Sequence, residues 1–416
     1  MKNWTMSNVG RWRFVIIGFN MMLVLGFLDS WSIFVLPIEA EFGWRRDQTT
    51  LAYSFAMISF SLGILLGGPL IDRRGPRLTA TVAGSLLCVG LFAAAFTSQL
   101  LHLYFAYGLV CGLSIGLLYN CIIATVVRWF PDKPGLVTGL LMVGTGAGSV
   151  ALGIWVAPLF DIISWRVVLQ LLGASAMLLI VGAGQLLRDP GSSPVTQQVS
   201  GKTVGQKHDY QWQEVIRMPA FWGIWFWHLF IIAGGQSALG HIVPYGVEQG
   251  VQAKQAALAM GVLAVSNACG RVVFGYLADQ AGRKFAMILA GATMTIAMVS
   301  LAVSVSYLGL VGLLVSAILI GFGYGGTIPQ VSAVVGDFFG TKHFGVNFGL
   351  ASTGIAVAAI IGPYLSGCIK SFAGDYERSF YLLAVLALVS SIMPLYIHNP
   401  QVGPVTKIIS DKGAEV

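Results

Sequence analysis

The sequence predicts an all-α membrane protein with twelve transmembrane helices in two pseudo-symmetric six-helix bundles. Composition is the first reason: 56% of the 416 residues are hydrophobic, only 10% are charged, and the mean hydropathy is +0.78. A soluble chain of this length could not bury so much apolar surface. The second reason is a set of long apolar runs, and the third is a repeat that relates the two halves.

Each predicted span is an apolar run of about 20 residues or more, which is enough to cross a hydrocarbon core of about 30 Å. The first run follows basic residues, as in a signal peptide, but it is too long and has no evident small-residue cleavage site, so we expect it to be retained. In chain order the spans are 14–37, 51–71, 78–98, 101–127, 135–160, 166–187, 219–245, 255–278, 285–306, 308–335, 344–369 and 378–397.

The basic residues predict the topology, because cytoplasmic loops are enriched in Lys and Arg. With both termini in the cytoplasm, most of the 24 basic residues fall in cytoplasmic segments, and the net charge of +7 requires no nucleic-acid partner. Arg271 alone is left inside a span. The short loops favour a bacterial inner membrane.

A single long polar segment, 188–217, divides the spans six and six. It is rich in Ser, Gln, Gly and Lys, as linkers are. We therefore predict an N-terminal bundle at 1–187, a cytoplasmic linker at 188–217 and a C-terminal bundle at 218–416. The end of the linker, "YQWQEVIR", predicts a short interfacial helix.

The two halves repeat each other. "GGPLIDRRGPR" (67–77) matches "FGYLADQAGRK" (274–284), with Asp72 and Asp279 separated by 207 residues. Parallel repeats of this kind are typical of alternating-access carriers. Two further pairs keep nearly the same offset: Pro37 with Pro244, and Phe130 with Phe339.

These residues resemble the major facilitator superfamily, since "GGPLIDRRGPR" is a good copy of that family's loop motif after span 2. The resemblance covers essentially the whole chain. "RWFPDKPGLVTGLLMVGTGAG" (128–148) is similar to the span-5 signature of monocarboxylate transporters, and "IRMPAFWGIW" (216–225) to the start of span 7 in bacterial oxalate:formate exchangers. The resemblance implies a carrier of small organic anions.

Arg271 is the main candidate for binding substrate. It lies eight residues before Asp279, so about 12 Å from the cytoplasmic end of its helix and near the bilayer centre. An arginine there costs about 3 kcal/mol, so it should face a partner or a water-filled cavity. The position 207 residues earlier is Ile64, which favours a ligand over a scaffold role, although a buried ion pair is the alternative. Monocarboxylate transporters carry an arginine at the matching place.

The number of cations in the spans predicts a substrate with one negative charge. Oxalate exchangers use a second cation, a lysine in span 11, where this chain has Ile355. A second carboxylate would remain unpaired in a desolvated site, at a cost of several kcal/mol. We therefore expect a monocarboxylate such as L-lactate or pyruvate.

Asp29 and His241 are the candidates for proton coupling. Asp29 lies well inside span 1 and could instead be held by nearby hydroxyls. Histidine as a residue type can exchange a proton near neutral pH, which makes His241 the second candidate. His241 is also a substrate-binding candidate, but it could be an ordinary interfacial histidine. Animal monocarboxylate transporters have a span-1 lysine and a span-8 aspartate where this chain has Leu28–Asp29 and Asn267, so the family's proton site does not transfer unchanged.

Further residues are predicted to contact the substrate, and spans 1, 4, 7 and 10 line the cavity in this superfamily, which includes the spans of Tyr119 and Tyr324. Asn267, one turn before Arg271, shares its face and can donate or accept a hydrogen bond. Tyr119 lies at nearly the same depth below the cytoplasmic face as Arg271. Alternatively, Asn267 and Tyr119 could each have a purely structural role. The remaining candidates are Tyr324 for the same wall, and Leu28 and Leu141 for an apolar surface or, alternatively, the protein core.

The loop motif predicts a gate. Asp72 and Arg73, with Asp279 and Arg283, lie at cytoplasmic ends of spans and could pair across the bundle in one state and separate in the other. The expected function is thus secondary transport of a small monocarboxylate, coupled to a proton, by a monomer in a lipid bilayer. The alternatives are an oxalate/formate-type anion exchanger and a membrane sensor. No enzyme activity, metal or cofactor is expected, because no catalytic or metal-ligand cluster is evident.

Overall fold

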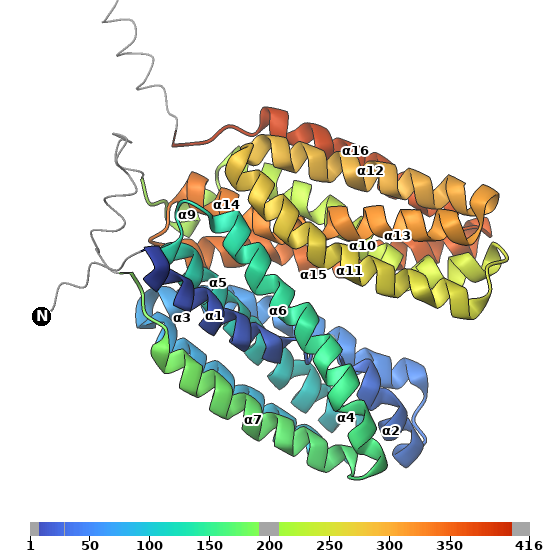
Figure 1. The fold of residues 1–416 in the computed structure, drawn as a ribbon, viewed down its shortest axis with the longest axis horizontal. Helices are drawn as coiled ribbons and strands as arrows, with labels where there is room; N and C mark the ends of the chain where they lie inside the picture. The colour runs from blue at the N-terminus through green and yellow to red at the C-terminus, as the bar shows by residue number, and fades with distance from the viewer. Residues whose placement is uncertain (1–7, 29, 191–207, 402–416) are drawn as a thin grey trace, which may run out of the picture.

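A computed structural model describes residues 8–28, 30–190 and 208–401, and every regular element in these ranges is helical. The helices fall into two groups, α1–α7 and α10–α16, which lie side by side (Figure 1). The all-α fold predicted from composition, apolar runs and the internal repeat is therefore confirmed. The predicted domain boundaries stay a prediction, since residues 191–207 lie outside the described ranges.

The first group begins with α1 (Asn8–Leu25) and α2 (Ser32–Phe42), which together cover the first predicted span. The rest of this group, in chain order, is α3 (Arg46–Ala95), α4 (Leu100–Leu103), the π-helix η1 (Tyr104–Cys111), α5 (Gly112–Trp129), α6 (Pro134–Trp155), the 3₁₀ turn η2 (Ala157–Asp161) and α7 (Trp165–Leu186).

The second group follows the short helix α9 (Trp212–Val215), which lies within the predicted "YQWQEVIR" segment. Its members are α10 (Pro219–Glu248), α11 (Ala253–Gln280), α12 (Arg283–Leu308), α13 (Leu310–Gly325), α14 (Thr327–Phe339), α15 (Phe344–Ala373) and α16 (Glu377–Tyr396).

Ten of the described helical segments are long and apolar enough to cross a membrane. The twelve predicted spans are recovered when two irregularities are considered. The segment α3 contains Gly75 with φ 78°, so it holds two spans joined by a tight turn, and the first span is divided between α1 and α2.

The two repeats share their turn geometry. Gly75 and Gly282 both have positive φ, 78° and 96°, and each follows a motif aspartate by three residues. A positive φ is readily adopted only by glycine, so the chain can reverse here without a Cβ clash. The repeat seen in the sequence is thus a repeat of backbone conformation.

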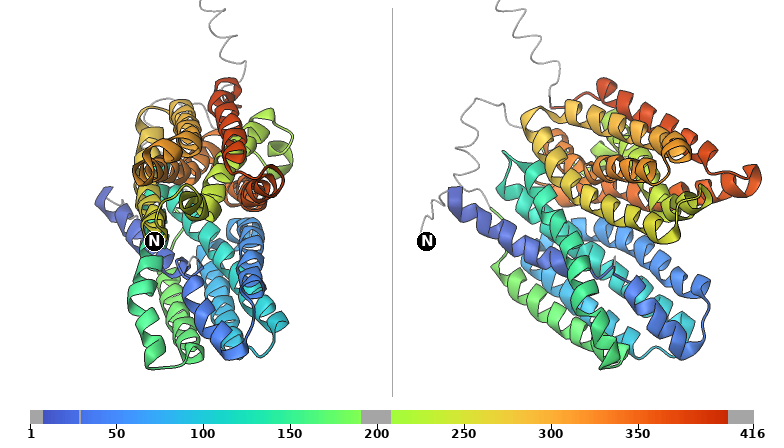
Figure 2. Two further views of the ribbon diagram at one scale, coloured as in Figure 1. Left: turned by 90° about the vertical axis from the view of Figure 1, so that its right-hand side faces the viewer. Right: turned by 45° about the vertical axis from the view of Figure 1, so that its right-hand side comes forward.

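Two helix crossings bring the groups together. A Cβ at Gly139 of α6 would overlap the carbonyl oxygen of Arg271 on α11, and one at Gly68 of α3 would overlap residues at the start of α15. Small residues allow such close backbone approach in membrane helices. In the two rotated views the groups again form separate bundles in contact along one face (Figure 2).

Candidate substrate-binding and gating sites

Arg271 reaches from the second bundle to the first. Its Nη1 donates hydrogen bonds to the carbonyl oxygen of Met142 and, at 2.8 Å, to Oγ1 of Thr145, both on α6. Among the described residues no carboxylate lies within ion-pair distance of Arg271. Both acceptors that hold the guanidinium in the described part of the chain are neutral.

Met142 contacts Arg271 and also two other polar side chains of the first bundle. The Thr145 hydroxyl donates to the Met142 carbonyl at 2.7 Å, and the Tyr119 hydroxyl lies 3.7 Å from Sδ of Met142. Tyr119, on α5, is 4% exposed and packs its ring against Phe60. Tyr119 and Arg271 thus both contact Met142.

Asn267 and Tyr324 lie on neighbouring helices of the second bundle. Asn267 is 7% exposed, and its backbone packs closely against Gly325 at the end of α13. The Tyr324 hydroxyl accepts a hydrogen bond of 3.1 Å from Gln236 of α10. Gln236 was not predicted from sequence, because an isolated glutamine in a span gives no signal of its direction.

His241 occupies a different environment from Arg271. Its Nε2 lies 3.0 Å from the Pro363 carbonyl of α15, and its ring lies 5.1 Å from that of Tyr376. Both neighbours belong to the second bundle. The placement corresponds to the structural alternative for this histidine, and its transport role stays a prediction.

Leu28 and Leu141 are both in the packed interior of the first bundle. Leu28 is 4% exposed, and its carbonyl oxygen lies 3.4 Å from the Tyr107 hydroxyl. Leu141 is fully buried, and its Cδ2 lies 2.8 Å from the position that a Cβ on Gly18 would occupy. These surroundings correspond to the alternative of core leucines, and a role of either residue in binding substrate stays a prediction.

The first span is interrupted between α1 and α2, which was not predicted. Amides of Gly26, Phe27, Leu28 and Ser30 bond to the carbonyl three residues earlier instead of four. Hydroxyls of Ser30 and Ser149 donate to the Gly26 carbonyl at 2.9 and 2.8 Å. Irregular backbone at this depth requires such partners, because lipid supplies none. Asp29 itself lies outside the described residues.

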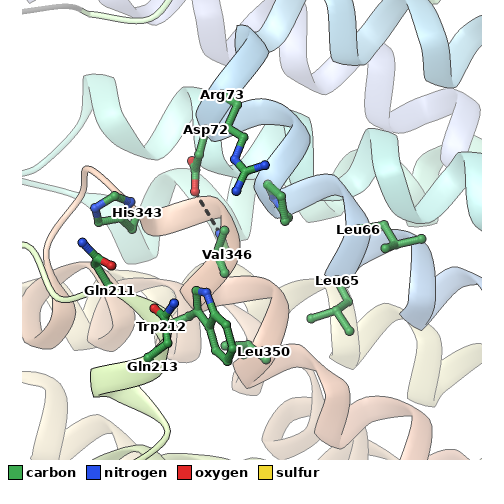
Figure 3. Close-up of a pocket in the computed structure, with 11 residues that line it drawn as sticks. Leu65, Leu66, Asp72, Arg73, Gln211, Trp212, Gln213, His343, Val346 and Leu350 are labelled. Atoms are coloured by element: carbon green, nitrogen blue, oxygen red, sulfur yellow. Dashed lines mark hydrogen bonds between the residues drawn. The ribbon is translucent and has the colours of Figure 1, made fainter.

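Asp72 connects the bundles at one end of the molecule. Its carboxylate accepts from the backbone amides of Gly345 and Val346, at 3.3 and 3.1 Å, where α15 begins (Figure 3). A carboxylate at a helix N-terminus is stabilised by the unpaired amides and the helix dipole. The same carboxylate pairs with Arg128 of α5.

Asp279 makes the symmetry-related connection. Its oxygens accept from the amides of Gly135 and Leu136, at 3.1 and 2.8 Å, where α6 begins. Arg283 pairs with Asp279 and also, at 2.7 Å, with Asp337. Both predicted aspartates therefore lie at contacts between the bundles.

Arg128 is the arginine that pairs with Asp72 in this conformation, whereas the sequence predicts Arg73 for the gate. Arg73 is exposed, whereas Arg128 donates to Asp72, to Asp189 at 3.0 Å and to the Thr341 carbonyl at 3.3 Å. The repeat could have revealed this residue, since the position 209 residues later is Asp337, the partner of Arg283. In the first repeat the aspartate of the pair lies in the loop motif and the arginine near the end of α5. In the second repeat the arginine lies in the loop motif and the aspartate near the end of α14.

Two ion pairs described at the opposite end each stay within one bundle. Arg166 of α7 binds Glu41 of α2 at 2.7 Å, and this hydrogen bond lowers the pKa of the Glu41 carboxyl. Lys370 of α15 binds Glu248 of α10 at 2.5 Å. The bundles diverge toward this end (Figure 1). The described conformation is therefore closed at the end that carries Asp72 and Asp279.

Comparison with known proteins identifies the family. The sequence model of the Major Facilitator Superfamily matches residues 15–329 and 292–413. The chain belongs to this superfamily and is a multi-pass membrane transporter, not an enzyme.

Similar sequences include two kinds of anion carrier by name. The oxalate:formate antiporter of Oxalobacter formigenes is 25% identical over 96% of this chain and 94% of its own length. Monocarboxylate transporter 13 of Rattus norvegicus is 28% identical over 92% of this chain and 88% of its own. At this identity neither relative determines the substrate.

Solved structures support the fold. A proton:xylose symporter of the superfamily, bound to 6-bromo-6-deoxy-D-glucose, superimposes with a TM-score of 0.75, covering 93% of this chain and 96% of the symporter. The fucose:proton symporter of E. coli gives 0.68, covering 92% and 98%. Each is 14% identical, so the likeness concerns the fold alone.

Proposed function

We propose that this protein is a secondary transporter of small monocarboxylates such as L-lactate or pyruvate, working by alternating access with a coupled proton. The observation that carries the proposal is the Arg271 guanidinium, which connects the two bundles through neutral acceptors on α6. A carboxylate binds a guanidinium more strongly than a carbonyl or hydroxyl does, because it adds the opposite charge and can accept two parallel hydrogen bonds. A substrate carboxylate can therefore compete for Arg271 with Met142 and Thr145.

The charge balance supports one carboxylate per substrate. Ile355 on α15 provides no second cation at the place where oxalate exchangers have lysine. A dicarboxylate would bring a second negative charge into the site without a partner, which is costly in a low-dielectric environment. The similarity to monocarboxylate transporters agrees with this choice, while the similarity to the oxalate:formate antiporter keeps exchange as the second candidate.

Contacts on α6 favour Asp29 over His241 as the proton site. Ser30, next to Asp29 in sequence, has its hydroxyl 3.4 Å from the Ser149 carbonyl, and a Cβ on Gly26 would lie 2.5 Å from the Thr145 carbonyl. The interruption of span 1 thus packs against the turn of α6 that holds Arg271. His241 contacts Pro363 and Tyr376 instead. We expect anion and proton to be coupled across this turn.

The proposal includes a bacterial inner-membrane location with both termini cytoplasmic, and function as a monomer. In that orientation the closed end is cytoplasmic and the protein faces outward. Two bundles of 1–187 and 218–416, joined by 188–217, would then rock about the α3–α15 and α6–α11 crossings. The positive loops at the closed end support this orientation.

Transport in proteoliposomes tests the proposal. Labelled lactate should enter vesicles that have no internal anion, and an inward proton gradient should accelerate uptake. Arg271→Lys should abolish uptake, because a point charge cannot reproduce the guanidinium geometry. Arg378→Lys, at the exposed start of α16, is the matched control and should transport normally.

Each alternative gives a different result. Uptake that requires a trans-side anion and ignores the proton gradient would support the exchanger and refute coupled symport. Lactate binding without accumulation would support the sensor. Normal uptake by Arg271→Lys would refute the assignment of the binding residue.

A further inference from the structure

A groove of about 550 Å³ lies at the closed end, on the outside of the contact between the bundles. Its walls come from α3 of the first bundle and from α9 and α15 of the second. The Asp72 to Val346 hydrogen bond lies in this wall (Figure 3). Anything that fills the groove therefore touches both bundles beside the gate.

The lining changes from apolar to polar along the groove. Leu65 and Leu66 lie on the right in Figure 3 and Leu350 lies lower, beside Trp212, whereas Arg73 lies above and His343 lies on the left. Gln211, which precedes α9, adds a polar group near His343. A ligand that matches this lining has an apolar part and a polar head.

The outer face of α3 indicates where the polar end of the groove lies relative to the membrane. Five apolar side chains that are 41–55% exposed follow one another at helical spacing along it, and Arg73 comes seven residues after the last of them, about 10 Å further along the helix. An exposed apolar stripe on a membrane helix faces acyl chains, and a basic residue at its end lies at the headgroup level. The five residues are Leu51, Phe55, Ile58, Leu62 and Leu66.

Trp212 strengthens this assignment from the second bundle. It lines the groove, is 45% exposed and belongs to the short helix α9. Tryptophan is enriched where hydrocarbon meets headgroups, because its ring is apolar and its N–H is polar. The groove thus opens at the membrane interface.

The charge of the groove favours an anion. Asp72 lines it, but its two oxygens are occupied by Arg128 and by the amides of Gly345 and Val346. Arg73 also lines the groove and is exposed. Its planar guanidinium can donate two parallel hydrogen bonds to a phosphate. A cationic headgroup would find no available carboxylate among the described lining residues.

We propose that this groove binds an anionic phospholipid of the surrounding leaflet. Its phosphate pairs with Arg73 beside Trp212, and one acyl chain follows Leu65, Leu66 and Leu350. Because the bound lipid contacts α3, α9 and α15 together, it stabilises the conformation that is closed at this end. This proposal does not depend on the transported substrate.

Native mass spectrometry of the purified full chain, titrated with phosphatidylglycerol or phosphatidylcholine, tests the site. We expect a saturable phosphatidylglycerol adduct and much weaker binding of phosphatidylcholine. Arg73→Gln should weaken phosphatidylglycerol binding about fivefold, as expected for one basic side chain at a lipid surface. Arg74→Gln removes a neighbouring exposed arginine outside the groove and should bind like the original protein.

A second variant protects the test against misfolding. Trp212→Ala changes the opposite wall and should also weaken the adduct, while thermal unfolding without added lipid checks that each variant is folded. Equal affinity of Arg73→Gln and the original protein, equal loss in Arg74→Gln, or equal binding of the two lipids would each overturn the proposal. So would displacement of the lipid by millimolar inorganic phosphate, since the acyl chain would then contribute nothing.

Discussion

At the residue scale, Arg271 shows how far sequence reasoning extends. Its depth and isolation follow from the sequence, because a charge within an apolar run is costly and rare. Its partners do not follow, since one is a backbone carbonyl and the other a threonine among many in the spans. Those contacts are set by how α6 crosses α11, which is a tertiary property.

Thr145 gives a prediction at this scale. Thr145→Val removes one hydrogen bond between the Arg271 guanidinium and a neutral acceptor in the empty carrier, worth about 1.5 kcal/mol. Because substrate must displace that bond, the KM for lactate should fall about tenfold, and Thr145→Ser should restore the original value. Kinetics of uptake in proteoliposomes measure this.

The control is Thr293→Val, on α12, whose half-buried side chain donates its hydroxyl to the Leu289 carbonyl one turn earlier in the same helix. Its KM should not change. A higher KM in Thr145→Val would contradict the competition and place the hydroxyl among the groups that bind substrate.

At the element scale, the spans are predictable and their irregularities are not. Apolar length indicates each span, but not the interruption between α1 and α2 or the π-helix η1 within the span that ends at Trp129. Such irregularities depend on partners from distant residues, as Ser149 for the Gly26 carbonyl. Pro134 and Pro219, by contrast, begin their helices as the missing N–H of proline permits.

The α6–α11 crossing gives a second prediction. Gly139→Ala places a methyl group on the Arg271 carbonyl, and overpacking of this kind costs about 1–3 kcal/mol. We expect lower thermal stability in detergent and reduced transport. Gly146→Ala is the matched control on the same helix, because nothing lies within 4 Å of its Cβ position.

Gly146→Ala should be as stable as the original protein or slightly more so, since alanine favours helix. Equal stability of the two variants in a thermal unfolding assay would refute the close contact at Gly139.

At the scale of the whole molecule, the repeat predicts two equivalent gates, and the structure places one motif aspartate of each repeat at a contact between the bundles, with different ion pairs. Asp72 forms an ion pair with Arg128, whereas Asp279 forms one with Arg283, which also pairs with Asp337. Sequence reasoning identified both aspartates because the loop motif is repeated. It missed Arg128 because only charges within the loop motif were considered. Arg128 lies outside that motif, near the end of α5, and its counterpart Asp337 lies near the end of α14.

The gate gives a third prediction. Asp72→Asn removes the negative charge at the start of α15 and leaves Arg128 without that partner, so the closed arrangement should lose population. Spin labels at the exposed positions 74 and 342, one on each bundle, should report a larger fraction of long distances. An unchanged distance distribution would show that Asp72 does not hold the bundles together.

The central claim is that Arg271 binds one substrate carboxylate. Titration calorimetry of the purified protein with lactate tests it most directly, with lactamide as the uncharged analogue. The account predicts that lactate binds, that lactamide does not, and that Arg271→Gln weakens lactate binding at least about thirtyfold, since loss of one partner in a buried charge pair costs about 2–5 kcal/mol. Equal lactate affinity in Arg271→Gln and the original protein would contradict the account.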